Sequence, residues 1–451
     1  MSILDTIAAP ATPRMMAALA VVRLSGPLSL SILQRMIKTD VGRIPSGHSF
    51  VSDIYQDASK GEQRIDTGVI TIHRAPHSYT GEDLVEFSLH GSTLIVDQLM
   101  DALCLHGARW AKPGEFTMKA AVNGRMSLVQ AEAVDALIRA DSPLSKDLAA
   151  SALKGKESKE LSSLRDTLLE CVADSEYALE ADTSVESDEE SITRLLSFTL
   201  PRVEVVLRQV SAGIAKGERG RRITDGIKAV ICGDPNTGKS SLLNALLGEE
   251  KAIVTSIPGT TRDIVEGTTI IGGITFRLLD TAGIRDTDDP VERIGVSRAL
   301  KALEEANIVL LVSDTGDFSL SEREQRAIGD KPLIKVGSKS DVSGPIPGAD
   351  VSTSSINSDI GSLKERMLQE SGIRLDSESY LFSQRDLAYM RNIEISLRTG
   401  IDALREKHLV DVFSDSLRVG VEYIDELLGN SRGQSGEDIY QTIFSRFCLG
   451  K

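Results

Sequence analysis

One stretch, from Gly233 to Ser240, limits the possible folds of this chain most, because it fits the pattern G-x-x-x-x-G-K-[ST] at every fixed position. A mostly apolar run of strand length, Ile227–Cys232, precedes it, and apolar residues recur at helical spacing between Ser241 and Leu247. Glycines in such a loop let backbone N–H groups turn inward onto a phosphate, and the helix N-terminus adds partial positive charge. The stretch therefore predicts a strand, a phosphate loop and a helix that bind a nucleoside triphosphate.

Two side chains of this loop have expected chemical roles. We expect Lys239 to reach the β and γ phosphates and to act in catalysis, and Ser240 to ligate Mg²⁺. The nucleotide-binding residues expected in the loop are Asn236, Thr237, Gly238, Lys239, Ser240 and Ser241.

Two further segments complete the pattern of a switch GTPase. An apolar strand runs into D-x-x-G at Asp280 to Gly283, where the carboxylate can hold the metal through water and the last amide can face a γ-phosphate. Between this segment and the loop, Thr261 is placed to complete the Mg²⁺ shell when triphosphate is bound. The nucleotide contacts expected here are Thr255, Ser256, Ile257, Pro258, Gly259, Thr260, Thr261, Asp280, Thr281, Ala282 and Gly283.

The guanine-reading motif N-K-x-D appears here as Ser338-Lys339-Ser340-Asp341, after the strand-like run Pro332–Val336. Asp341 can accept both N–H donors of guanine, so guanine remains the expected base. Serine in place of asparagine leaves fewer bonds to the base and to the phosphate loop, at a cost of about 0.5–1.5 kcal/mol, which is at most about tenfold in affinity. The next base-contacting segment, usually S-A-[KR], reads Ser352-Thr353-Ser354, and we expect Ser352 and Thr353 to contact the nucleotide.

Composition limits the partners and the compartment. A chain of 451 residues is too long for one core and suggests about three domains. A net charge of −15 argues against a broad basic surface for nucleic acid. The 4 cysteines show no C-x-x-C spacing, so neither a zinc site nor a disulfide framework is expected, and a reducing cytoplasm is the expected location. We find no apolar run of about 18 residues and no export signal, so no membrane is expected.

The pattern of apolar residues predicts how the domains follow one another. Residues 1–121 mix short strand-like runs with turns and predict an α+β domain, whereas 122–223 are helical. A basic, glycine-containing linker is expected at Lys216–Arg222. Residues 224–373 alternate strands and helices, which predicts a mostly parallel sheet covered on both faces, and helices resume over 374–451. The GTPase domain is therefore expected to be inserted into one helical domain, so that nucleotide state can act on helices from both ends.

Four further stretches of the chain form a recognisable set. They are Asp5–Ala9 with Arg23–Gly26, Tyr79–Asp83 with Glu86, Lys112–Thr117, and the ending Phe447–Lys451, which fits F-C-[IVL]-G-K. With these stretches the chain closely resembles the MnmE (TrmE) family of tRNA modification GTPases, and the resemblance covers almost the whole length. The resemblance implies an N-terminal α+β folate-binding and dimerisation domain, a helical domain, and an inserted Ras-like P-loop GTPase domain.

The resemblance also implies an activity and partners. The function would be modification of the tRNA wobble uridine at C5, of the carboxymethylaminomethyl type, driven by GTP hydrolysis with K⁺ and Mg²⁺. The chain would form a homodimer and a heterotetramer with the FAD-dependent partner MnmG. A tetrahydrofolate derivative, in the 5-formyl or methylene form, would supply the one-carbon unit.

By the same resemblance, the folate contacts would fall on Arg23, Glu86, Arg125 and Lys451, with Cys448 nearby. Arginine can fork to folate carboxylates or to its polar edge, and a glutamate can accept from the amino-pteridine ring. The family places a glycine-rich loop near this site or near the dimer contact, whereas this chain has Arg14–Ala18.

Hydrolysis needs a group that positions water and a cation at the developing charge. The residue after D-x-x-G, where many relatives have glutamine, is Ile284, which cannot orient water. The resemblance assigns that role to Glu292. It assigns the K⁺ ligands to Asn236, Thr255, Ile257 and Thr260, with the GTPase domains dimerising across the ion.

Two other interpretations remain open at this point. One is a ribosome- or RNA-assembly GTPase switch without modification activity, against which the N-terminal domain and the C-terminal motif argue. The other is a scaffold with degenerate nucleotide specificity, suggested by Ser338.

Overall fold

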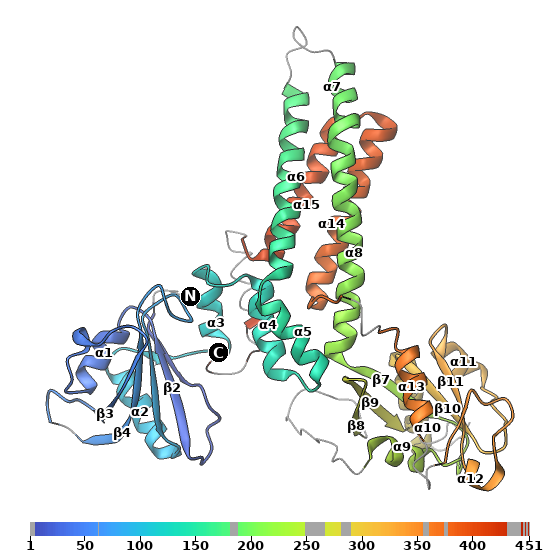
Figure 1. Cartoon of the computed structure of the whole chain (residues 1–451), viewed down its shortest axis with the longest axis horizontal. Coiled ribbons are helices and arrows are strands. Elements are labelled where there is room, and N and C mark those ends of the chain that lie inside the picture. The colour runs from blue at the N-terminus through green and yellow to red at the C-terminus, as the bar shows by residue number, and fades with distance from the viewer. Residues whose placement is uncertain are drawn as a thin grey trace. The chain divides into compact units, whose positions relative to one another are not determined.

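The computed structural model describes residues 5–61, 63–180, 188–248, 267–280, 290–354, 360–373 and 378–430, together with 443, 444, 447 and 450. Figure 1 shows the helices and strands of the chain, coloured from blue at the N-terminus to red at the C-terminus. The chain divides into two compact units. The first contains Met1–Asp135, Ser151–Val210 and Ala388–Lys451, and the second contains Ala136–Ala150 and Ser211–Leu387.

The first unit begins with a six-stranded sheet in the order β3-β4-β5-β2-β1-β6. Neighbouring strands are antiparallel apart from β1 and β6, which are parallel. Alternate residues, such as Val22 and Phe87, point to one face and pack with Leu33 and Leu99 of two helices that cover it. This confirms the predicted α+β domain. The elements are β1 (Ile7–Pro10), β2 (Leu19–Ser25), α1 (Ser29–Met36), β3 (His48–Tyr55), β4 (Arg64–His73), β5 (Leu84–His90), α2 (Thr93–Leu105), β6 (Arg109–Trp110) and α3 (Glu115–Val122).

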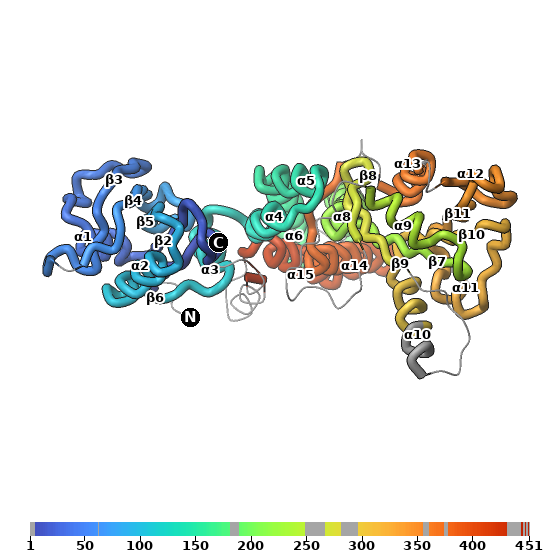
Figure 2. The backbone as a smooth tube through the Cα atoms, turned by 90° about the horizontal axis from the view of Figure 1, so that it is seen from below, coloured from blue at the N-terminus to red at the C-terminus, as the bar shows by residue number. Residues whose placement is uncertain are grey.

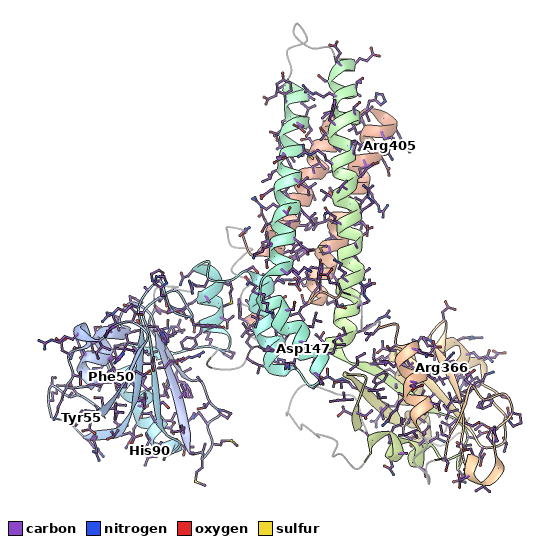
Figure 3. All side chains as sticks on the ribbon, in the orientation of Figure 1. Phe50, Tyr55, His90, Asp147, Arg366 and Arg405 are labelled. Carbon is purple, nitrogen blue, oxygen red and sulfur yellow. The ribbon has the colours of Figure 1, made fainter. Side chains whose placement is uncertain are left out.

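Long helices follow, and they confirm the predicted helical region. Ion pairs fasten neighbouring helices to each other: Arg165 of α6 binds Asp425 of α15 at 2.6 Å, and Arg405 of α14 binds Glu204 of α8 (Figure 3). The helices are α4 (Leu128–Arg139), α5 (Pro143–Leu153), α6 (Lys156–Glu180), α7 (Asp188–Arg194), α8 (Leu200–Asp225), α14 (Gln384–Lys407) and α15 (Val410–Leu428), with a π-helical turn at Leu195–Thr199.

The expected linker at Lys216–Arg222 is wrong, because these residues lie inside α8. Their glycines serve close packing instead of a turn. A Cβ atom at Gly220 would lie 1.9 Å from the carbonyl oxygen of Tyr380, and one at Gly217 would lie 2.6 Å from Phe382 Cδ2. Each glycine costs a helix roughly 0.5–1 kcal/mol relative to alanine, and here the glycines allow the segment before α14 to pack directly on α8.

A second six-stranded sheet carries the predicted nucleotide-binding motifs. Its order is β12-β11-β10-β7-β9-β8, with parallel neighbours except for the antiparallel pair β8 and β9. Figure 2 labels five of these strands on the backbone trace, from β7 to β11. Strand β10 is buried at every position, as expected for a parallel strand covered on both faces. This confirms the predicted mostly parallel sheet. The elements are β7 (Ile227–Cys232), α9 (Lys239–Leu247), β8 (Gly267–Ile271), β9 (Ile274–Asp280), α10 (Pro290–Glu305), β10 (Ile308–Ser313), α11 (Glu322–Ile328), β11 (Leu333–Gly337), α12 (Ser340–Ser343), β12 (Val351–Ser352) and α13 (Gly361–Glu370).

The sheet order places the site. Strand β7 lies between β10 and β9, so the connections on its two sides run in opposite directions across the sheet. In open sheets of this kind, ligands bind at the carboxyl ends of the strands where the connections change direction. Among the helices in the described ranges, none combines the length and the apolar character needed to cross a membrane.

Candidate active site

The loop after β7 has the backbone shape that its sequence predicted. Gly233 has φ 136°, and a Cβ atom there would lie 2.2 Å from the carbonyl oxygen of Val312 on β10. Asn236 and Gly238 are left-handed, with φ 65° and 91°. The loop therefore passes tightly over the end of β10 and curls back into the first turn of α9, where backbone N–H groups can meet an anion.

Lys239 is buried within this loop, with 8% of its surface exposed. Its Nζ donates to the carbonyl oxygens of Gly233 at 2.9 Å and Asp234 at 2.6 Å. The Thr237 hydroxyl also donates to the Asp234 carbonyl oxygen, at 2.8 Å. The ammonium group is thus held inside the curl of the loop, where it can neutralise the charge of bound phosphates.

Two side chains, Ser240 and Asp280, show whether this part of the site suits the expected Mg²⁺ ion. Ser240 Oγ, at the start of α9, donates to Asp280 Oδ2 at 2.8 Å, at the end of β9. Asp280 Oδ1 is buried and has no hydrogen-bond partner among the described residues. A buried carboxylate oxygen beside a hydroxyl is the oxygen donor set that Mg²⁺ accepts, directly or through water. These residues therefore fit a magnesium ion.

The loop after β11 is hydrogen-bonded to the phosphate loop. Ser338 Oγ, which is buried, donates to the carbonyl oxygen of Thr237 at 2.5 Å. Lys339 Nζ donates to the carbonyl oxygen of Asn236 at 2.9 Å and pairs with Asp314 at 2.5 Å, and this ammonium group holds the pKa of the Asp314 carboxyl below its usual value. The sequence suggested that serine at 338 weakens the tie to the phosphate loop, whereas the structure keeps a bond there.

Asp341 is oriented by a residue that sequence reasoning left out of the nucleotide-binding set. Ser354 Oγ donates to Asp341 Oδ1 at 2.8 Å, which leaves the other carboxylate oxygen for a base. Ser352 Oγ accepts from the backbone N–H of Ile346 at 3.0 Å, and Thr353 N–H donates to the Gly337 carbonyl oxygen at 2.7 Å. Base contacts by Ser352 and Thr353 stay predictions. The only sequence signal for Ser354 is its place in the weakly matching segment.

In the first unit, two of the predicted folate contacts, Arg23 and Glu86, form an ion pair between neighbouring strands. Arg23 of β2 lies opposite Glu86 of β5, and Arg23 Nε donates to Glu86 Oε1 at 2.7 Å. The guanidinium also lies 5.5 Å from the ring centroid of Tyr79, whose hydroxyl shares a hydrogen bond of 2.8 Å with Thr117. Burial raises the pKa of Tyr79, so the phenol stays protonated. The result is a partly buried polar and aromatic patch.

Gly450, close to the end of the sequence, contacts this patch. Arg23 Nη1 donates to the carbonyl oxygen of Gly450 at 3.3 Å. Gly450 has φ 87°, and a Cβ atom there would lie 2.3 Å from the carbonyl oxygen of Pro10. A Cβ atom at Gly114 would lie 2.6 Å from the carbonyl oxygen of Phe444. The four stretches that carry the family resemblance therefore meet in one place, and there is no room even for a Cβ atom at these two glycines.

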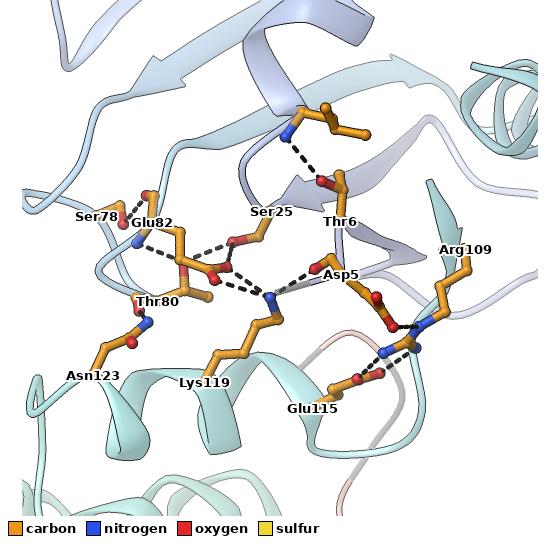
Figure 4. A network of polar contacts seen from close by, with 11 residues as sticks. Asp5, Thr6, Ser25, Ser78, Thr80, Glu82, Arg109, Glu115, Lys119 and Asn123 are labelled. Carbon is orange, nitrogen blue, oxygen red and sulfur yellow. Dashed lines mark hydrogen bonds and ion pairs between the residues drawn. The ribbon is translucent and has the colours of Figure 1, made fainter. Parts of the chain in front are cut away.

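Beneath the Tyr79–Asp83 turn lies a buried polar network that sequence reasoning missed (Figure 4). Lys119, only 1% exposed, pairs with both oxygens of Glu82 at 3.0 and 2.9 Å and donates to the Asp5 carbonyl oxygen at 2.8 Å. Ser25 Oγ donates to Glu82 Oε2 at 3.2 Å. Nothing in the sequence marks this lysine, because its burial follows only from how α3 packs against the sheet.

Arg125, the third predicted folate contact, is exposed beside the same turn. A Cβ atom at Gly81 would lie 3.2 Å from Arg125 Cγ. Glu292 belongs to α10, but its side chain lies outside the described residues. The other predicted residues outside the described part are Thr255, Ser256, Ile257, Pro258, Gly259, Thr260, Thr261, Thr281, Ala282, Gly283, Cys448 and Lys451.

Comparison with known proteins gives a consistent result along the chain. The family described as "GTP-binding protein TrmE N-terminus" matches residues 6–125, and the "MnmE helical domain" family matches residues 128–448. The protein named tRNA modification GTPase MnmE of Aquifex aeolicus is 38% identical over 459 residues, which cover 99% of this chain and 100% of the relative. The protein of the same name from Thermotoga maritima is 36% identical over 470 residues, with the same coverage.

Solved structures also resemble part of the chain. Aquifex aeolicus Era bound to GDP and AlF4⁻ is 26% identical over 38% of this chain and 66% of that one, with a TM-score of 0.25. The G domain of the T. maritima FeoB iron transporter is 26% identical over 32% of this chain and 98% of that one, with a TM-score of 0.24.

Proposed function

The chain belongs to the family of the tRNA modification GTPase MnmE, and from this premise we propose that it hydrolyses GTP and uses the cycle to modify tRNA. The observation that carries the proposal is the junction of Lys239, Ser240 and Asp280 at the carboxyl ends of β7 and β9. It offers an ammonium group for the phosphates and oxygen donors for Mg²⁺ beside the first turn of a helix. Asp341, oriented by Ser354, supplies the acceptor for guanine.

For the hydrolysis step, we propose that Glu292 orients the attacking water and that K⁺ supplies positive charge near the β–γ bridge. Support for a potassium site comes from Asn236, which is exposed in the loop and held left-handed by the Lys339 bond to its carbonyl oxygen. Its amide oxygen is a neutral donor of the kind that a monovalent cation accepts. Thr255, Ile257 and Thr260 would complete the set.

For the modification, we propose a tetrahydrofolate site around Arg23 and Glu86, with Arg125 and Lys451 as further contacts. Arg23 is charged, partly buried and fixed by Glu86 and Gly450, so it can bind a carboxylate or the polar edge of a pteridine with little rearrangement. Tyr79 adds an aromatic face next to it. The folate, when bound, would supply the one-carbon unit for C5 of the wobble uridine.

The same proposal extends to partners and to domain limits. We propose a homodimer that joins the flavoprotein MnmG in a heterotetramer, acting on tRNA in the cytoplasm. The domains would be 1–121 for folate binding and dimerisation, 122–223 and 374–451 for the helical domain, and 224–373 for the GTPase. Support for an inserted GTPase domain comes from the helical-domain family, whose match runs from 128 to 448 and so spans it.

The test is a comparison of nucleotide hydrolysis and of folate binding on the full chain. We expect hydrolysis of GTP and not of ATP, stimulated by K⁺, and saturable binding of 5-formyltetrahydrofolate that Arg23→Ala weakens. Arg64→Ala, which removes an exposed arginine paired with Asp53 on the same sheet, is the matched control. GTP hydrolysis without folate binding would favour the assembly-switch alternative, and equal rates with ATP would contradict the guanine site.

A further inference from the structure

The corner between α4 and α5, residues 140–145, is shaped by its own hydrogen bonds. Ser142 Oγ accepts from the backbone N–H of Ser145 at 3.3 Å, and Ser145 Oγ accepts from the backbone N–H of Ser142 at 3.2 Å. This reciprocal pair caps the start of α5, where Pro143 occupies the first helical position. Asp141 directly precedes the cap, so its carboxylate lies outside the helix.

Asp141 binds strand β9 of the GTPase sheet, although its two partners come 134 and 136 residues later in the chain. Its Oδ1 accepts from the hydroxyl of Thr275 at 2.7 Å, and its Oδ2 pairs with Arg277 Nη2 at 3.3 Å. Thr275 is only 2% exposed. The backbone N–H of Leu144 also donates to the carbonyl oxygen of Gly273 at 3.2 Å, in the turn between β8 and β9. Three bonds therefore join the α4–α5 corner to one hairpin of the sheet.

Arg277 joins the same strand to a second helix. Its Nε donates to the carbonyl oxygen of Asp225, the last residue of α8, at 3.0 Å. Leu148 of α5 also reaches α8, because its Cδ2 lies 3.3 Å from the position that a Cβ atom would take at Gly220. Helix α5 therefore packs against both α8 and the β8–β9 turn, and all of these residues belong to the second compact unit.

Strand β9 runs from these contacts to the candidate metal position. Thr275 and Arg277 precede Asp280, which is the last residue of the strand. The strand is paired with β7 on one side and with β8 on the other. Because a strand that is hydrogen-bonded on both sides tends to open as one cooperative unit, a ligand that holds one end also restrains what is bonded to the other.

We propose that the α4–α5 corner responds to the occupancy of the nucleotide site. The corner stays closed on β9 while nucleotide and Mg²⁺ hold Asp280, and it opens more often when the site is empty. Asp141 carries this coupling through Thr275 and Arg277, and so passes the state of the site to α5. The contact is additional to the two chain connections between the GTPase domain and the helices. The inference rests on the proposed GTPase site.

The experiment is hydrogen–deuterium exchange of the full chain, read by mass spectrometry, without nucleotide and with GDP and Mg²⁺. We expect GDP to slow exchange in α9, which borders the phosphate site. It should also slow exchange in residues 140–150 by about fivefold or more, the lower end of the usual coupling between two sites. Asp141→Ala removes both side-chain bonds. In this variant GDP should still slow exchange in α9, whereas the slowing in residues 140–150 should fall below about twofold.

Two further changes separate the contact from general effects on α5. Asp147→Ala is the matched control, because Asp147, labelled in Figure 3, is an exposed carboxylate of α5 that pairs with Lys146. This variant should keep the wild-type response in residues 140–150. Thr275→Ser keeps the hydroxyl and should also keep the response, whereas Thr275→Val removes the donor and should reduce it.

A wild type in which GDP slows exchange in α9 but leaves residues 140–150 unchanged would overturn the inference, whether or not any variant folds. An Asp141→Ala variant with the full wild-type response would do the same, because the bonds to β9 would then be packing contacts only. Failure of the proposed function would look different, because GDP would then leave exchange in α9 unchanged as well, and the inference would fall with it.

Discussion

Ser240 and Asp280 share a hydrogen bond of 2.8 Å although they are 40 residues apart in the chain. The bond exists because β7 and β9 are parallel neighbours, with Ile231 paired to Asp280, so both strands deliver their next residues to the same edge. The second Asp280 oxygen is left buried and unbonded among the described residues. The pair therefore offers oxygen donors for a cation at this edge of the sheet.

Asp280→Asn should raise the Mg²⁺ concentration needed for half-maximal GTP hydrolysis by about 10- to 100-fold, the usual effect of losing an outer-sphere partner of a metal. The cause is the loss of the negative charge beside Ser240. A Mg²⁺ titration of the GTPase rate measures the effect. Asp317→Asn, in an exposed loop after β10, is the matched control and should leave the titration unchanged. An Asp280→Asn enzyme with the wild-type Mg²⁺ dependence would rule out this role.

Lys239→Ala should abolish hydrolysis and weaken GDP binding by about 100-fold or more, as expected for a lost hydrogen bond to a charged group inside a buried site. Fluorescent GDP titration and a phosphate-release assay measure the two effects. Lys228→Ala is the control, because Lys228 belongs to the preceding strand and pairs with Glu305 outside the site. Unchanged turnover in the Lys239 variant would contradict the phosphate-loop assignment.

Glu292→Ala should lower kcat by about 10²- to 10⁴-fold, the size of a lost general-base contribution, with nucleotide affinity nearly unchanged. Glu304→Ala, on the same helix and exposed, is the matched control. Single-turnover hydrolysis measures the step directly. If the Glu292→Ala variant hydrolysed GTP at the full rate, another group, such as Arg285 or Arg293 acting across an interface, would have to carry the chemistry.

Replacing K⁺ by Na⁺ should also lower kcat, because the smaller ion fits oxygen donors spaced for K⁺ poorly. It should reduce any dimer of GTPase domains that forms with a transition-state mimic. The Glu292→Ala variant should still dimerise in K⁺, since it keeps the cation ligands. Sedimentation with GDP and AlF4⁻ in each salt separates the two effects, and equal wild-type turnover in both salts would exclude a potassium role.

Lys119→Met should destabilise the N-terminal domain by up to about 3–5 kcal/mol, because Glu82, whose side chain is only 18% exposed, would lose its ammonium partner. The chain has a single tryptophan, Trp110 on β6, so its fluorescence during urea unfolding reports on this domain. Lys112→Met, at an exposed lysine, is the control. The double variant with Glu82→Leu should recover part of the loss, and a fully stable Lys119→Met would show that the pair contributes little.

Local sequence was sufficient for the nucleotide-binding core. The strand Ile227–Cys232, the loop with Lys239 and the following helix were predicted because each depends on neighbours in the chain. The linker predicted at Lys216–Arg222 was wrong because the conformation of this segment depends on residues far away in the chain. Glycine is permissive for turns and also for close packing, and only the position of Tyr380 and Phe382, more than a hundred residues later, decided between the two.

The sequence by itself determined which chemical groups are available: the phosphate loop, the guanine-reading Asp341, and the family stretches with Arg23 and Gly450. The tertiary structure decided what those groups bind. It joined Arg23 to Gly450 across 427 residues, buried Lys119 against Glu82, and directed the one proton of Ser338 to the phosphate loop. Such contacts depend on how strands and helices pack on one another, and local residue patterns carry no record of that packing.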